Sequence, residues 1–110
     1  MYLYTRDYVR VDIPASLEEC YKALDNKLDE NTKKYIKNSS LKALPYRTFE
    51  IRMWIHSKWI HPANGRIDKV FRDAGYTNTD EMALEIIIGY HYYLNGIHYE
   101  INPKTDDKGR

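Results

Sequence analysis

The sequence predicts a mainly α-helical single domain, in which three to four helices pack around a helix near the C-terminus. Three observations support this prediction. Apolar residues recur at helical spacing through most of the chain, and capping residues, Gly and Pro mark where these stretches begin and end. A chain of 110 residues is the size of one domain. We therefore expect a helical domain over residues 1–103 and a disordered polar tail over 104–110.

The first two elements are predicted to be a short strand and an amphipathic helix. Residues 8–13, YVRVDI, alternate apolar and polar side chains, as a half-buried strand does. Apolar residues return at helical spacing over 17–29, and Ser16 with Glu19 forms a capping box in front of them. Cys20 lies on the apolar side of this helix. Nothing nearby would lower the pKa of its thiol, so we interpret Cys20 as a buried structural residue.

Residues 30–43 are polar and are expected to form a short helix followed by a loop, with Asn31 or Thr32 as the N-cap. Pro45 suits the first turn of the next helix, which we expect over residues 45–60.

The helix expected over 45–60 carries two apolar stripes, whereas a helix with one core face shows one. The stripe that we assign to the core holds Tyr46, Phe49, Met53 and Ile60, with His56 beside it. The other holds Ile51, Ile55 and Trp59. The N-terminal helix or the terminal ribbon covers this second stripe, or a partner does. Because Trp and Arg dominate interface energetics, our hypothesis is a partner-binding surface of Arg52, Ile55, Lys58 and Trp59, with Tyr92 as a further candidate.

Two more helices are predicted towards the C-terminus. Asn64 is the expected N-cap of a helix over 65–74, and Gly75 suits the left-handed residue at its end. Thr79 is the expected N-cap of a helix over 79–94. Apolar residues cover most of the circumference of this last helix, so we expect it to be buried at the centre of the domain.

A second strand is expected over residues 97–101, IHYEI, which alternate again before Pro103. We predict that residues 8–13 and 97–101 pair as a two-stranded antiparallel ribbon. Such a ribbon would have to pack on the helices, because a lone pair of strands is marginally stable.

Composition excludes several classes of protein. The formal net charge of +1 lacks the basic excess that is typical of nucleic-acid binding. A single Cys excludes an intrachain disulfide and a Cys-based zinc site. No apolar run approaches the ~18 residues of a membrane span, and the opening MYLYTRDYVR lacks the apolar core of a signal peptide. We therefore expect a cytoplasmic protein without a membrane partner.

No catalytic, metal-binding or cofactor-binding pattern stands out. The chain lacks H-E-x-x-H, G-x-S-x-G, a phosphate-binding loop and G-x-G-x-x-G. His56 and His61 are five residues apart across a helix end and should not share a face; we interpret His56 as a histidine at the edge of the core with a hydrogen-bonded ring nitrogen. We expect no metal, no cofactor and no enzyme activity, and keep an enzyme with a dispersed site as a further alternative.

The helices expected within 65–94 leave a nucleic-acid-binding alternative open. Their lengths and the Gly between them are those of a helix-turn-helix. Against it, Asp80 and Glu81 open the second helix and would repel phosphate, while the basic residues Arg66, Lys69 and Arg72 lie on the first.

Several motifs together resemble those of a known family. They are I-P-x-S/N-L-E-E at 13–19, two Trp five apart in W-I-H-S-K-W at 54–59, R-[IL]-x-K-x-F at 66–71, and D-x-M followed by Y-H-x-Y-L-N-G within 80–96. This pattern is similar to that of small bacterial proteins known only as a domain of unknown function. The resemblance implies one compact, mainly helical domain and brings no assigned activity.

By elimination, the sequence favours a small non-enzymatic protein that binds and occupies the surface of a partner protein, as immunity proteins, antitoxins and phage-encoded inhibitors do. A homodimer is an alternative form of the same function. The chain holds eleven Tyr, which suit the rim of a small core and a recognition surface alike. A nucleic-acid-binding regulator is the second alternative.

Overall fold

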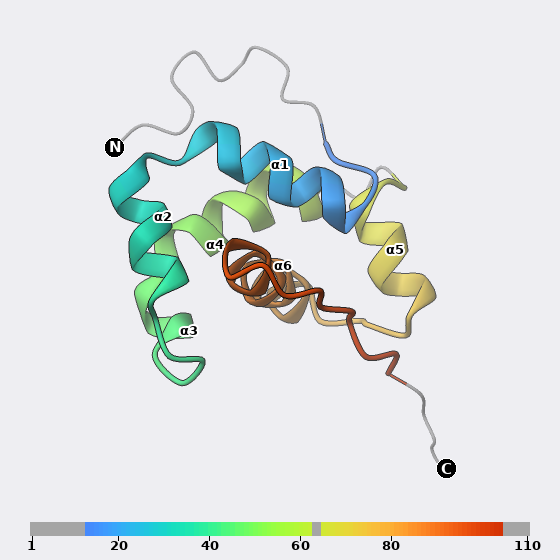
Figure 1. Ribbon diagram of the computed structural model, residues 1–110. Helices are drawn as coiled ribbons and strands as arrows, with labels where there is room; N and C mark the ends of the chain where they lie inside the picture. The colour runs from blue at the N-terminus through green and yellow to red at the C-terminus, as the bar shows by residue number, and fades with distance from the viewer. Residues whose placement is uncertain (1–12, 63–64, 105–110) are drawn as a thin grey trace.

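The helices surround α6 (Thr79–Leu94), which runs through the middle of the computed structural model (Figure 1). The structure describes residues 13–62 and 65–104. The other elements, in chain order, are α1 (Leu17–Lys27), α2 (Glu30–Lys37), α3 (Leu44–Arg47), α4 (Phe49–Ile55), the π-helix η1 (His56–Ile60) and α5 (Ile67–Asp73). Helix α6 contacts α1, α2, α4 and η1. The predicted mainly α-helical fold is confirmed, but the predicted number of three to four helices is too low, because the described residues form six α-helices and one π-helix.

The central position of α6 follows from its composition. Its buried residues, which form one broad arc of the helix, are Met82, Ala83, Ile86, Ile87, Gly89 and Tyr90, and Leu84 and Ile88 outside this arc are half-buried. The predicted N-cap, Thr79, is wrong by one residue. The side chain of Asn78 accepts the backbone N–H groups of Asp80 and Glu81 at 2.8 and 3.1 Å. The hydroxyl of Thr79 is instead hydrogen-bonded to His56.

The first two helices begin at short-range side-chain caps. The predicted capping box of α1 is confirmed: Ser16 accepts the backbone N–H of Glu19 at 3.1 Å, and the Glu19 carboxylate accepts that of Ala15 at 2.8 Å. For α2 the predicted caps are wrong, because Asp29 accepts the N–H of Thr32 at 2.8 Å. The helix therefore starts two residues earlier than a cap at Asn31 implies.

The helix predicted over 45–60 is divided into three pieces. Thr48 separates α3 from α4; its hydroxyl donates to the carbonyl of Leu44 at 2.8 Å, and the residue is buried. The last five residues form η1, in which His61 N–H donates to the carbonyl of His56, five residues back, at 2.7 Å. A π-turn takes more residues than an α-turn, so the rings of His56 and His61 stack at 6.2 Å, contrary to the prediction.

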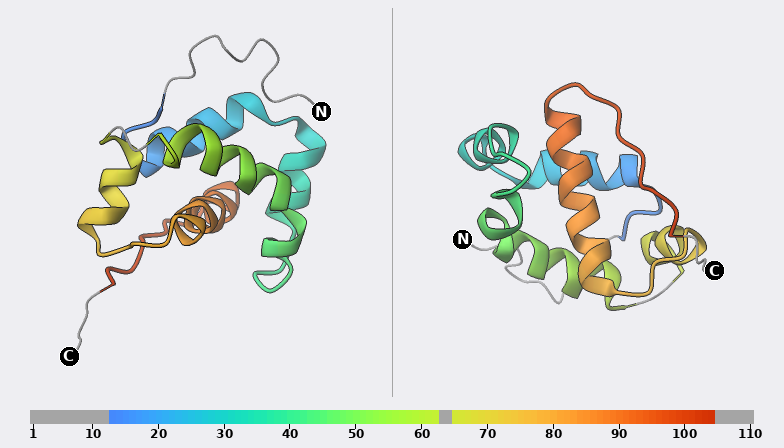
Figure 2. Two further views of the ribbon diagram at one scale, coloured as in Figure 1. Left: turned by 180° about the vertical axis from the view of Figure 1, so that it is seen from behind. Right: turned by 90° about the horizontal axis from the view of Figure 1, so that it is seen from below.

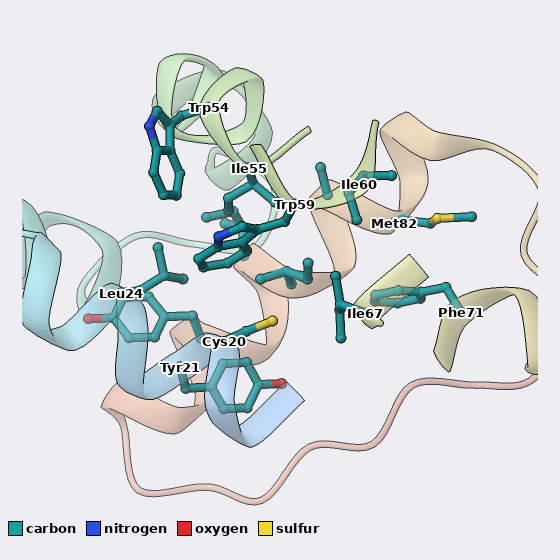
Figure 3. Close-up of a cluster of buried hydrophobic side chains, with 14 of the residues drawn as sticks. Cys20, Tyr21, Leu24, Trp54, Ile55, Trp59, Ile60, Ile67, Phe71 and Met82 are labelled. Atoms are coloured by element: carbon teal, nitrogen blue, oxygen red, sulfur yellow. The ribbon is translucent and has the colours of Figure 1, made fainter. Parts of the chain in front are cut away.

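The core uses the stripe that the sequence assigned to a partner. Ile55 and Trp59 are 0 % and 1 % exposed, and Trp59 points towards Cys20 and Leu24 of α1 (Figure 3). The prediction that Ile55 and Trp59 form a partner-binding surface is therefore wrong, because α1 and α6 enclose them. Cys20 is fully buried, as predicted.

Most of the stripe that the sequence assigned to the core faces solvent instead. Its aromatic and Met side chains, at Tyr46, Phe49 and Met53, are exposed, so their assignment to the core is also wrong. Ile60, which the sequence placed in the same stripe, is buried. The π-turn accounts for Ile60, because its wider turn places this residue off the single helical register on which the prediction rested.

The predicted terminal ribbon is not supported. Residues 97–101 form no strand within the described part of the chain, and residues 8–12 of the other expected strand lie outside it. After Gly96 the chain turns back and runs beside α6 (Figure 2). It ends near the start of that helix, where Lys104 N–H donates to the carbonyl of Ala74 at 2.6 Å. Residues 105–110 of the expected tail, and the expected cap Asn64, also lie outside the described residues.

Candidate functional site

Three predicted site residues remain at the surface, in two separate places. Arg52 and Lys58 are half-buried on α4 and η1. The guanidinium of Arg52 donates to the carbonyl of Pro45 at 2.6 Å, so this side chain leans towards α3 and away from Trp59. Tyr92 is half-buried near the end of α6 and stacks on Tyr99, with 5.0 Å between the ring centroids. The structure therefore does not bring the five predicted residues together.

Another group of apolar side chains lies exposed on neighbouring helices. It consists of Tyr35 (48 % exposed), Tyr46 (85 %), Phe49 (56 %) and Met53 (54 %). We call these four residues the α2–α4 face. Helices α2, α3 and α4 come together at one end of the molecule (Figure 1). Singly exposed apolar residues are ordinary on a protein surface, so the interest lies in their adjacency.

Two adjoining hollows show that these four side chains are neighbours. A groove of about 650 Å³ lies between the α1–α2 corner and helices α3 and α4, and Tyr35, Tyr46 and Phe49 line it. Phe49 also lines a second hollow of about 400 Å³, which it shares with Met53 and Arg52. The α2–α4 face is therefore continuous through Phe49.

Two arginines lie against the rings of this face. The guanidinium of Arg47 is 4.6 Å from the ring centroid of Tyr35, and that of Arg52 is 5.6 Å from the ring centroid of Phe49. Both distances are within the range of cation–π attraction, which is worth ~0.5–1 kcal/mol at exposed sites. Lys27, Asp29 and Glu50 also line the groove, so side chains of both charge signs surround the apolar residues.

The sequence held a signal for this face that the prediction overlooked. Leu44, Thr48, Ile55 and Trp59 stand at positions i, i+4, i+11 and i+15, which is helical spacing, and all four are buried. Counting the polar Thr48 as an inward residue gives one core stripe and leaves Tyr46, Phe49 and Met53 outside it. A hydroxyl can be buried at such a position because it donates to the carbonyl four residues back.

A second cluster, around His56, has the residue types of a catalytic site but not the geometry. His56 Nε2 is 2.7 Å from the hydroxyl of Thr79 and 3.8 Å from a carboxylate oxygen of Asp80. Both oxygens face the same ring nitrogen. In a catalytic triad the carboxylate holds the other nitrogen and so orients the base towards the nucleophile. This cluster joins η1 to the start of α6, and it confirms that His56 lies at the edge of the core with a hydrogen-bonded ring nitrogen.

The single thiol lies in the interior. Cys20 is fully buried, and burial raises the pKa of its thiol, so the thiol is held in its neutral, poorly nucleophilic form. Among residues 13–62 and 65–104, no group of three His, Cys, Asp or Glu side chains is placed to hold a metal ion. Within the same residues, none of the helices combines the length and apolar content needed to cross a bilayer.

Comparison with known families places residues 13–94, about three quarters of the chain, in the domain of unknown function DUF6794. The chain belongs to this family. No curated protein and no solved structure matches it. The matched residues include the whole α2–α4 face and end at the last residue of α6, so the segment that runs back beside α6 lies outside the family domain.

Proposed function

We propose that this protein binds another protein through the α2–α4 face and acts by occupying the surface of that partner. The observation that carries the proposal is the continuous exposure of Tyr35, Tyr46, Phe49 and Met53 beside Arg47 and Arg52. Aromatic residues, Met and Arg are the types enriched in protein interfaces, and Tyr and Arg are frequent among the residues whose loss weakens binding most.

The arrangement of these side chains also supports the proposal. Tyr46 projects almost fully into solvent, and the groove beside it is shallow and lined by charges of both signs. A partner can bury Tyr46 and Phe49 while the surrounding polar groups keep water contacts at the rim, as in other protein interfaces. The arginine stacks reduce the rotamer freedom that a partner would otherwise have to remove.

Nucleic-acid binding by α5 and α6 has less support. The second helix of a helix-turn-helix presents its polar face to the major groove. Here α6 is the central helix, with six buried residues, and its first turn carries Asp80 and Glu81. An enzyme with a dispersed site also has less support, because the His56 cluster lacks an orienting carboxylate at the second ring nitrogen.

The proposal is tested by placing a photo-crosslinking amino acid at Tyr46 in cells of the natural source and identifying the cross-linked protein. The binding of that purified protein is then measured with the wild type and with a Phe49→Ala/Met53→Ala variant. We expect the variant to bind about 30-fold more weakly, the factor that corresponds to a loss of ~2 kcal/mol at an interface centre. Its unfolding free energy should change by ~0.5 kcal/mol per site or less, because both side chains are exposed.

Leu41→Ala is the matched control, since Leu41 is 47 % exposed and lines neither hollow of the α2–α4 face. It should bind the partner as the wild type does. The proposal is wrong if the Phe49→Ala/Met53→Ala variant keeps full affinity, or if only the Leu41→Ala variant loses it.

A further inference from the structure

The segment from Ile97 to Lys104 is extended and fixed at both ends. It spans the length of α6, which is ~24 Å for 16 residues, and eight residues reach at most ~26–29 Å. At its start, Ile97 N–H donates to the carbonyl of Tyr92 at 2.9 Å. At its end, the Tyr76 hydroxyl donates to the carbonyl of Asn102 at 3.2 Å, before Lys104 joins Ala74. The segment is therefore held straight by its ends.

Between these ends the backbone has no partner strand among residues 13–62 and 65–104. Within the described part of the chain, no backbone–backbone hydrogen bond involves residues 98–101. The side chains alternate, with Tyr99 and Ile101 half-buried and His98 and Glu100 exposed. The Tyr99 hydroxyl donates to Glu85 at 2.7 Å and anchors the middle of the segment to α6. An extended chain with unpaired N–H and C=O groups resembles the edge of a β-sheet.

An apolar groove lies alongside this edge. Its volume is about 590 Å³, and residues 96–101 form one side of it. Leu17 and Tyr21 of α1, Tyr93 of α6 and Val70 of α5 contribute the other walls. The carboxylates among its described lining residues are those of Glu18 and Glu100, the latter 3.0 Å from His98 Nε2, and these described residues include no Lys or Arg. The groove therefore offers apolar walls, an unpaired backbone and an acidic rim.

We propose that an extended peptide of a partner protein binds in this groove as an added β-strand beside residues 98–101. Another extended peptide backbone presents C=O and N–H groups at the same spacing, so it can pair with the alternating N–H and C=O groups of this segment. Apolar side chains at alternate positions of the peptide would contact Leu17, Tyr21 and Tyr93. A Lys or Arg between them would face Glu18 and Glu100 at the rim. Because the segment is already straight and anchored, binding costs it little conformational entropy.

This site is separate from the α2–α4 face, and the experiment keeps the two apart. A display library of eight-residue linear peptides is selected on the full chain, and the enriched peptides are synthesised and their affinities measured. Each is then scanned with N-methyl groups along its backbone. We expect enriched peptides to alternate apolar residues with Lys or Arg. N-methylation should abolish binding at every second residue only, because alternate N–H groups of an edge-bound strand point to the protein and to solvent.

Two further measurements locate the peptide. Backbone amide resonances of residues 98–101 should shift on binding, while those of the α2–α4 face should not. Glu18→Lys/Glu100→Lys should weaken binding by about tenfold at low salt and less at high salt, because both carboxylates are exposed and screened. Met53→Ala is the matched control and should bind the peptides as the wild type does.

Three results would overturn the proposal. One is a selection that enriches no peptide, or enriches peptides that shift the amide resonances of the α2–α4 face instead of those of residues 98–101. Another is an N-methyl scan without alternation, which would mean recognition by side chains alone. The last is contact between residues 98–101 and the first twelve residues in the free chain, since the chain itself would then fill the groove.

Discussion

Replacing Gly89 by Ala reverses the usual effect of this substitution in a helix. In the middle of a helix, Gly→Ala ordinarily stabilises by about 1 kcal/mol. Here a Cβ on Gly89 would lie 1.9 Å from the Tyr21 hydroxyl oxygen and 2.8 Å from Cζ of the same ring. Ordinary contact begins at 3.4 Å, so the ring has to retreat by about 1.5 Å. Tyr90 and Tyr93 flank this ring at 6.4 and 5.3 Å and leave it little room.

Overpacking of this kind costs ~1–3 kcal/mol, which exceeds the gain in helix propensity. We expect Gly89→Ala to lower the free energy of unfolding by about 1 kcal/mol, measured by urea denaturation with an unchanged slope. The same substitution in three backgrounds isolates the cause. In the wild-type background, Gly89→Ala has its full destabilising effect. In the Tyr21→Phe background the effect is smaller, because Cζ becomes the ring atom nearest to the new Cβ. In the Tyr21→Leu background, Gly89→Ala should stabilise by about 1 kcal/mol. The reasoning is refuted if Gly89→Ala stabilises the wild type as much as the Tyr21→Leu variant.

Three other predictions follow from burial and capping. Trp59→Ala should cost ~3–5 kcal/mol and Phe49→Ala about 0.5 kcal/mol or less in urea denaturation, and equal costs would contradict the assignment of Trp59 to the core. Hydrogen bonds from Thr32 lower the pKa of Asp29 in the folded state. The stabilisation by this carboxylate is therefore present above the unfolded pKa and is lost as the pH falls through the folded pKa. Asp29→Asn should keep the cap and reduce the difference in stability between thermal melts at pH 7 and pH 3. The Cys20 thiol should react with a disulfide reagent only after denaturation. Rapid labelling of the native protein would mean that the thiol is accessible to solvent and contradict its burial in the core.

The fold class could be predicted because its signals are local. The Ser16–Glu19 capping box, the left-handed Gly75 and Gly96, and the broad apolar circumference of 79–94 each involve residues within a few positions of one another. Such contacts form in the same way whatever the rest of the chain does, so these elements appear close to where the pattern placed them.

The candidate site could not be predicted in the same way. Choosing between the two stripes of 45–60 required knowing which side α1 (Leu17–Lys27) and α6 (Thr79–Leu94) cover, and this depends on residues far away along the chain. Helices α1 and α6 cover the stripe of Ile55 and Trp59, which leaves Tyr46, Phe49 and Met53 on the outward side. For 97–101 the alternation predicts a strand, but the described residues form none, because an extended segment becomes a strand only when another backbone pairs with it.

The sequence by itself therefore determined the mainly helical fold, the capping box of α1, the central position of α6 and the burial of Cys20, because short-range hydrogen bonds and apolar periodicity specify them. Only the tertiary structure decided which aromatic residues are core and which are surface. Burial of a side chain depends on what packs against it, and two stripes of similar hydropathy on one helix gain the same free energy per unit of area removed from water. The helices that arrive from elsewhere in the chain enclose Trp59 and leave Tyr46 in solvent.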